Sequence, residues 1–115
     1  MICYDTVFPG VADTLTKKGA QILFSPSRIV KEGIDPWKMY VQVRSLENRI
    51  PIVAPNVIDR KFGGNSLIIE LQKKEKIVKT KLTELYGESS ESIDIIFSNY
   101  KEIRKHRLED RNNFQ

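Results

Sequence analysis

Short apolar runs alternate with helical patterns along this chain, and that alternation restricts its fold more than any other feature. The run Ala20–Phe24 is bounded by Gly19 and by Ser25-Pro26-Ser27, as is typical of a buried strand. Before it, apolar spacing predicts a helix from Val11 to Lys18, which Gly19 ends. Ile2–Tyr4 has the character of a strand end. The first part of the chain therefore predicts a strand, a turn, a helix and a second strand, a unit that normally pairs its strands in parallel.

A longer helix is predicted in the middle of the chain. Asp35-Pro36 combines an N-cap residue with proline at the first helical position. From Trp37 to Asn48 the apolar residues form an imperfect helical stripe. Arg44 and Glu47 lie three residues apart in this segment, and that spacing favours a local ion pair.

Three further strands and a last helix complete the predicted order. Ile50–Ala54 is a strand candidate, and the runs Ser66–Leu71 and Ile77–Leu82 predict an antiparallel hairpin around a basic turn. A terminal amphipathic helix is expected from Ser92 to Arg107, with Ser92 or Asp94 as its cap. The 115 residues fit one domain with one core, of the α/β class.

The net charge of +4 leaves two interpretations open. Basic residues concentrate between Lys73 and Lys81 and again from Lys101 to Arg111, a distribution that would suit a nucleic acid. The second stretch also contains Glu102, Glu109 and Asp110, so a solvated helical face of mixed sign is the commoner outcome. Because no aromatic platform or reading motif accompanies the charge, nucleic-acid binding is not favoured.

The cellular setting is inferred from what the sequence contains. The longest apolar runs are far shorter than the ~20 residues needed to span a bilayer, and no secretory signal pattern is visible at the amino terminus. We therefore expect no membrane segment. Cys3 is the only cysteine, so no internal disulfide can form and a reducing, cytoplasmic location is the simplest inference. A lone cysteine is by itself more often incidental or buried than catalytic.

The segment Ile2-Cys3-Tyr4-Asp5 followed by Phe8-Pro9, together with several separated blocks after it, resembles one family. This family is the carbon-nitrogen hydrolases of the nitrilase superfamily, which cleave amides and nitriles, and the first segment is similar to its nucleophile segment. The other blocks follow in the family's order along nearly the whole chain: Gly19-Ala20, Pro26-Ser27, Trp37, Arg44, Glu47-Asn48, Val53-Ala54-Pro55-Asn56, Gly64-Asn65-Ser66, Ile93-Asp94-Ile95 and Asp110-Arg111. The resemblance implies that residues 1–115 are a single partial domain, the carboxy-terminal half of a carbon-nitrogen hydrolase domain.

This resemblance implies a fold and a reaction. The fold would be half of a nitrilase-type α-β-β-α sandwich, with a mixed sheet flanked by helices. The reaction would be hydrolysis of a small amide through a glutamate, lysine and cysteine triad, with Cys3 as the nucleophile and the backbone N–H of Tyr4 in the oxyanion hole. No cofactor or metal is implied. Val7 and Gly10 stand where many members have arginine and glutamate, which bears on substrate recognition.

The triad, however, is incomplete in this sequence. In the family both the glutamate and the lysine precede the nucleophile, and only two residues precede Cys3 here. We therefore expect the chain to be inactive alone. The expected partner is a second copy, giving a homo-oligomer, or a separately encoded amino-terminal half; the alternative function is a non-catalytic remnant that acts as an interaction or assembly module. A partner would cover apolar sheet surface, which we expect at Ile22, Phe24, Ile52, Val53, Leu67 and Ile69.

Overall fold

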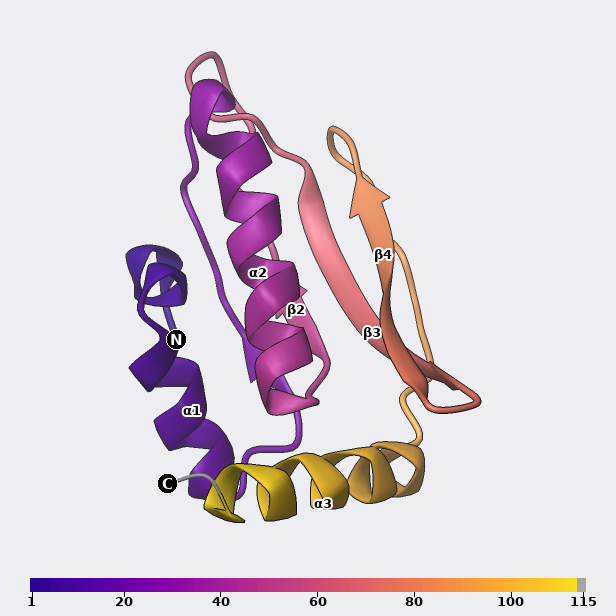
Figure 1. Cartoon of the computed structure of the whole chain (residues 1–115). Helices are drawn as coiled ribbons and strands as arrows, with labels where there is room; N and C mark the ends of the chain where they lie inside the picture. Colours follow the sequence, from indigo (N-terminus) through magenta and orange to yellow (C-terminus); the bar gives the residue numbers. More distant parts are fainter. Residues whose placement is uncertain (114–115) are drawn as a thin grey trace.

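The computed structural model describes residues 1–113, without the side chains of residues 108, 111 and 112. A four-stranded sheet in the order β1-β2-β3-β4 carries helix α2 across one face, with α1 beside α2 and α3 across one end of the sheet (Figure 1). The elements in chain order are η1 (Cys3–Val7), α1 (Pro9–Lys17), β1 (Leu23–Phe24), η2 (Lys31–Gly33), α2 (Ile34–Asn48), β2 (Ile52–Ala54), β3 (Ser66–Lys74), β4 (Ile77–Leu85) and α3 (Phe97–Asn113). The α/β class with a mixed sheet is confirmed.

The amino terminus differs from the predicted strand end. Ile2 is extended, but a 3-10 helix begins at Cys3, because the Asp5 N–H donates to the carbonyl oxygen of Ile2 over 2.9 Å. The Asp5 carboxylate also accepts the N–H of Ile2 at 3.0 Å, which closes the turn. The terminal amino group donates to the Phe24 carbonyl at 3.2 Å, and the Cys3 N–H donates to the Pro26 carbonyl at 3.0 Å. Residues 1–3 thus run parallel to β1 and the residues after it, but they do not form a regular strand.

Helix α1 ends as the sequence predicts. Gly19 has a φ of 102°, a left-handed conformation that glycine adopts without strain. Its N–H donates to Thr16 and the N–H of Ala20 donates to Leu15, at 3.0 and 3.1 Å. This pair of bonds satisfies carbonyl groups that the end of a helix leaves free.

Helix α2 begins slightly earlier than predicted. Gly33 is its N-cap, so Asp35 and Pro36 lie inside the first turn instead of at the cap and first position. Proline is tolerated there because the first N–H groups of a helix have no intrahelical acceptor, and the Asp35 carboxylate suits the positive end of the helix dipole. The helix ends at Asn48, and Arg49 follows it in the left-handed conformation with a φ of 52°.

The core lies between α2 and one face of the sheet. Strands β1 and β2 are parallel, whereas β3 pairs antiparallel with both β2 and β4. The strand register places Leu23, Ile52 and Ile69 in one row, and these side chains pack with Trp37 and Val41 of α2 in the buried cluster.

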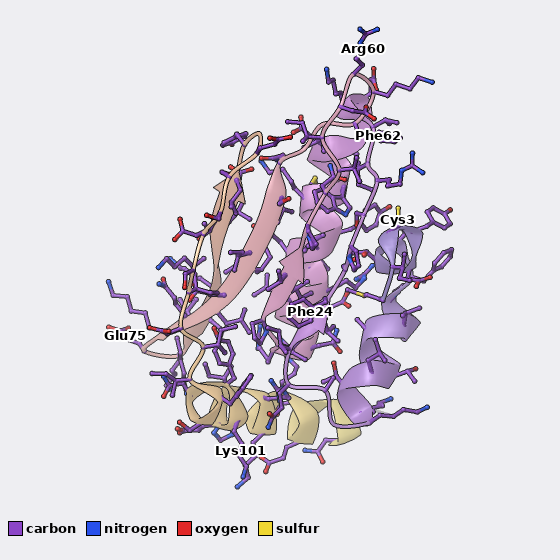
Figure 2. The ribbon with its side chains drawn as sticks, turned by 180° about the vertical axis from the view of Figure 1, so that it is seen from behind. Cys3, Phe24, Arg60, Phe62, Glu75 and Lys101 are labelled. Atoms are coloured by element: carbon purple, nitrogen blue, oxygen red, sulfur yellow. The ribbon has the colours of Figure 1, made fainter. Side chains whose placement is uncertain are left out.

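The structure corrects the prediction of which residues lie on the uncovered face of the sheet. Successive strand residues point to opposite faces, so one face cannot contain both Ile52 and Val53. Ile52, Leu67 and Ile69 are fully buried on the α2 side. The next register row, Phe24, Val53 and Ile68, lies on the opposite face, where the Phe24 side chain is 56% exposed (Figure 2).

The terminal helix begins later than predicted. After β4 the chain passes back alongside the hairpin without regular structure, and α3 starts at Phe97 instead of Ser92 or Asp94 (Figure 1). Tyr100 is the buried anchor of this helix, because its hydroxyl accepts the N–H of Leu71 at 3.2 Å. No helix within residues 1–113 is long and apolar enough to cross a membrane.

Candidate functional site: the Cys3 turn

Cys3 occupies a conformation that is uncommon for a residue with a side chain. Its φ is 47°, in the left-handed region, at the first position of η1. Such conformations raise the free energy and persist only where the surroundings hold them, often at functional sites. The side chain is partly buried, at the edge of the molecule beside β1 (Figure 2), and its thiol has no hydrogen-bond partner among the described residues.

The backbone N–H of Tyr4 is available to a ligand. In η1 the first intrahelical bond is donated by Asp5, so the N–H groups of Cys3 and Tyr4 have no acceptor within the helix. Cys3 donates to Pro26, and within residues 1–113 the N–H of Tyr4 has no acceptor. A thiol and an N–H that has no acceptor among residues 1–113 therefore stand on successive residues.

Buried contacts fix the far end of this turn. The Thr6 hydroxyl lies 2.9 Å from that of Ser25, and both side chains are fully buried. Arg44 of α2 donates from Nε to the Thr6 carbonyl at 2.9 Å and from Nη2 to the Val7 carbonyl at 3.2 Å. Only 5% of Arg44 is exposed, so these bonds lie within the protein. Ser25, directly after β1, and Arg44 of α2 thus both hold the end of η1.

The predicted Arg44–Glu47 ion pair is confirmed at 2.7 Å between Nη1 and Oε1. The sequence did not reveal the two backbone bonds of Arg44, since they join residues 37 and 38 positions apart. The ring of Tyr40 lies under the guanidinium, 5.9 Å from its centroid. Arg44 is therefore a positioning residue for the Cys3 turn. Its third nitrogen, Nη1, donates to the carboxylate of Glu47.

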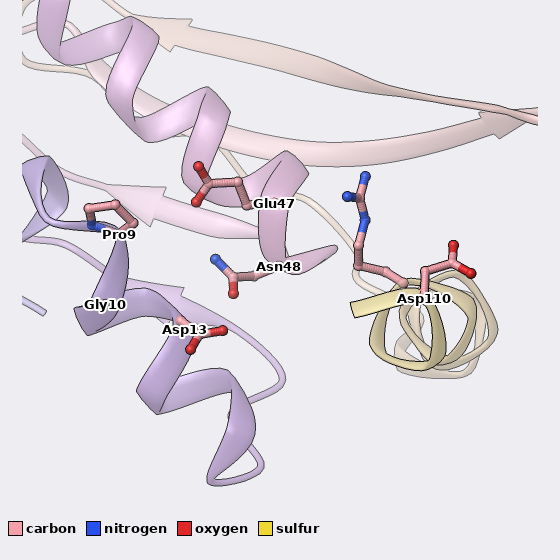
Figure 3. Close-up of a pocket in the computed structure, with 7 residues that line it drawn as sticks. Pro9, Gly10, Asp13, Glu47, Asn48 and Asp110 are labelled. Carbon is pink, nitrogen blue, oxygen red and sulfur yellow. The ribbon is translucent and has the colours of Figure 1, made fainter. Parts of the chain in front are cut away.

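The two residues that depart from the family pattern lie close to these contacts. The carbonyl oxygen of Val7 accepts a hydrogen bond from Arg44, and Gly10 lies in the first turn of α1. A cavity of about 640 Å³ opens between α1, the end of α2 and α3 (Figure 3). Its lining includes Gly10, Asp13 and Glu47 but neither Cys3 nor Tyr4. A side chain at position 10 would have room, because a Cβ there meets no atom within 4 Å.

One lysine–glutamate ion pair in this chain joins elements that do not include the Cys3 turn. Lys38 of α2 forms an ion pair with Glu84 of β4. The hydrogen bond to Lys38 is the main cause of the lowered pKa of Glu84, and the same bond raises the pKa of Lys38. Glu84 also accepts the Tyr86 hydroxyl at 2.8 Å. Within the described residues no cluster of three or more histidine, cysteine, aspartate or glutamate side chains could hold a metal ion.

Asn56 is a structural residue whose role the sequence did not reveal. Its Oδ1 accepts the Ile29 N–H at 2.7 Å, and its Nδ2 donates to the Gly64 carbonyl at 2.5 Å. The backbone N–H of Asn56 donates to the Ser66 hydroxyl at 2.9 Å. The side chain of Asn56 thus joins the loop that follows β1 to Gly64, and its backbone bonds to the first residue of β3.

Comparison with known proteins identifies the family. The family model described as carbon-nitrogen hydrolase matches residues 1–74. A probable nitrilase from Schizosaccharomyces pombe is 35% identical over 109 residues, covering 91% of this chain and 39% of that protein. The 2-oxoglutaramate amidase of Bacillus subtilis (strain 168) is 36% identical over 74 residues, covering 61% of this chain and 29% of that protein.

The fold agrees with this match. The crystal structure of a carbon-nitrogen hydrolase from Helicobacter pylori G27 superposes with a TM-score of 0.62 at 19% identity, over 92% of this chain and 42% of that one. The chain therefore spans well under half the length of these relatives. By sequence, it belongs to the carbon-nitrogen hydrolase family of the nitrilase superfamily.

Proposed function

We propose that this chain supplies the nucleophile part of an amidase-type carbon-nitrogen hydrolase, with Cys3 as the nucleophile and the Tyr4 N–H as an oxyanion donor. The observation that carries the proposal is the left-handed backbone of Cys3, followed by an N–H group without an acceptor among residues 1–113. Relatives named as an amidase and a probable nitrilase support the reaction class. The substrate class is a small linear amide.

The chemistry follows from these two groups. After a base takes the thiol proton, the Cys3 sulfur bonds to the amide carbonyl carbon, and the carbonyl oxygen takes the electron pair. The Tyr4 N–H donates to that oxygen; losing one such donor typically slows a reaction by about a hundredfold or more. When the intermediate collapses, the C–N bond breaks, the leaving nitrogen takes a proton and a thioester remains on Cys3. Water then hydrolyses the thioester, releasing the acid and restoring the thiol.

This reaction also needs a base and a cation. Members of the family supply both from residues that precede the cysteine. The glutamates that the structure places in ion pairs contact other groups: Glu47 pairs with Arg44, Glu70 with Lys81, Glu84 with Lys38 and Glu109 with His106. We therefore propose that the 115-residue chain is inactive alone. An amino-terminal half, encoded separately, would supply these two groups. Either that half or a second copy of the chain in a homo-oligomer would cover the exposed sheet face, and a cytoplasmic setting would keep Cys3 reduced.

The uncovered sheet face supports a partner of this kind. Phe24, on the edge strand β1, is 56% exposed (Figure 2), and Val53 beside it is only partly covered, whereas Ile68 further along the same row is buried. Tyr4 and Phe8, whose rings stack edge to face with centroids 5.2 Å apart, are also largely exposed. The same surface favours the second candidate function, a non-catalytic interaction or assembly module.

Complementation separates the two functions. The chain would be mixed with an amino-terminal half of a carbon-nitrogen hydrolase that carries the glutamate and lysine, and ammonia release from small amides would be measured. Restored hydrolysis that Cys3→Ala and Cys3→Ser both abolish supports the enzyme. Binding without hydrolysis supports the interaction module. Turnover by the chain alone, lost in Cys3→Ala, contradicts the claim that it is incomplete.

A further inference from the structure

The two basic stretches of the sequence, far apart along the chain, lie around one cavity. It has a volume of about 370 Å³ and opens between the turn of the β3–β4 hairpin, the end of α2 and α3. Its charged lining consists of Arg49, Lys73, Lys76 and Arg107, with Asp110 as the single carboxylate. The tertiary structure therefore concentrates four cations that the sequence distributes over nearly 60 positions.

These positive charges have little internal compensation. Among residues 1–113, none of the four cations forms an ion pair, and the nearby Glu109 lies 3.8 Å from His106 instead. Burial lowers the pKa of Arg49, and the positive charge of Arg107 lowers it further, as expected for two guanidinium groups without a carboxylate between them. An anion placed between these groups would relieve that repulsion.

The fold holds Arg49 in place at the end of α2. Arg49 donates from Nη1 to the Leu46 carbonyl at 2.8 Å, and its own carbonyl accepts Nε of Arg104 at 3.2 Å. The Nη2 atom of Arg104 is buried and has no acceptor in the described part of the chain. A further guanidinium thus adds positive potential immediately beside the cavity, and α3 is joined to the end of α2.

We propose that this cavity binds a small molecule through a phosphoryl group. Its volume falls in the range of ligand pockets, and it offers donors from three separate elements, which suits an anion with three or more oxygens. Guanidinium groups bind phosphate oxygens in a bidentate manner, and lysines add point charges. The imidazole of His106 is the only aromatic ring in the lining, so the cavity lacks the stacking platform of a single-stranded nucleic-acid site.

This site is separate from the proposed nucleophile. Six of its eight lining residues follow residue 74, where the match to the family model ends, and Cys3 is not among them. A test of anion binding at this cavity therefore gives its result independently of whether the proposed amide hydrolysis is correct.

Calorimetric titration of the 115-residue chain with pyrophosphate tests the proposal. We expect saturable 1:1 binding with a Kd below about 1 mM at low salt, weakening as salt rises. Lys76→Gln combined with Arg107→Gln should weaken it at least about tenfold, because each removes a charged donor from the cavity. The matched control is Lys101→Gln combined with Lys105→Gln, the same charge change elsewhere on α3, where Lys101 points away from the molecule (Figure 2).

The control pair should bind pyrophosphate as the unmodified chain does, and thermal melts of both variants should show that they are folded. Equal weakening in the control pair would overturn the proposal, since net charge would then explain the binding. Absence of saturation by about 10 mM pyrophosphate would also overturn it. Succinate that binds as tightly as pyrophosphate would contradict the phosphoryl assignment, and a short DNA that binds more tightly and displaces pyrophosphate would contradict the small-molecule assignment.

Discussion

Nε of Arg44 donates to the carbonyl oxygen of Thr6 over 2.9 Å, so a residue near the end of α2 holds the turn that begins at Cys3. The same guanidinium reaches Val7 and Glu47. A planar group with several fixed donors can serve three acceptors at once, which a lysine ammonium in the same place cannot do with the same geometry. The position of the candidate nucleophile thus depends on a residue about 40 positions further along the chain.

Replacing Arg44 should destabilise the protein strongly. Arg44→Ala leaves the buried carbonyl of Thr6 and the partly buried carbonyl of Val7 without this donor, and we expect the free energy of unfolding to fall by about 3 kcal/mol or more, with Arg44→Lys intermediate. Urea unfolding followed by circular dichroism measures this. Glu47→Gln is the matched control: its carboxylate is 44% exposed, so its loss should cost less than about 1 kcal/mol. Equal losses in both variants would show that the ion pair, and not the backbone bonds, carries the stability.

Two glycines should respond to alanine in opposite directions. At Gly10 a Cβ meets nothing within 4 Å, and alanine favours the helix, so Gly10→Ala should stabilise by about 0.5 kcal/mol. At Gly63 a Cβ would lie 2.6 Å from Cγ1 of Ile34, so Gly63→Ala should destabilise by about 1–3 kcal/mol. Thermal melts of the two variants provide the comparison. A lower melting temperature for Gly10→Ala would contradict the expected open space beside α1.

Asn56→Asp replaces a donor by an acceptor at the junction of three segments. The new oxygen would face the carbonyl of Gly64, to which Nδ2 now donates at 2.5 Å, and we expect a loss of about 2–3 kcal/mol. Asn99→Asp changes the same chemistry on the exposed first turn of α3 and should be nearly neutral. Both are checked by urea unfolding at pH 7. If the two variants lose the same stability, the Asn56 side chain does not join the loops as described.

The Lys38–Glu84 pair predicts a pH dependence. The pKa of Glu84 is lowered in the folded state, so its contribution is present above the ordinary carboxyl pKa of roughly 4.3 and is lost as the pH falls through the folded value. The pKa of Lys38 is raised, so its contribution persists below roughly pH 10.4 and is lost above the folded value. Melting temperatures of the unmodified chain and Glu84→Gln should therefore differ most near pH 7 and converge at pH 3. A constant difference at all pH values would contradict this ion pair.

The misplaced boundaries have particular causes. The apolar character of Ile2–Tyr4 favours a strand end, yet the Asp5 carboxylate bends the chain there by accepting the N–H of Ile2. Good capping residues favour a start of α3 at Ser92 or Asp94, but the helix begins at Phe97, close to the buried Tyr100 that fixes it to β3. Local propensity suggested both assignments, and a side-chain contact decided each of them.

Four features can be predicted from the sequence because each depends on neighbouring residues or on a pattern along the chain: the family, the alternation of strands and helices, the Gly19 helix end and the Arg44–Glu47 pair. Three other features become visible only once the chain is folded: which apolar residues face α2, how Arg44 holds the Cys3 turn, and the cavity that Arg49, Lys76 and Arg107 share. Those relationships join positions tens of residues apart. Strand register and helix packing set them, and neither is encoded in local spacing.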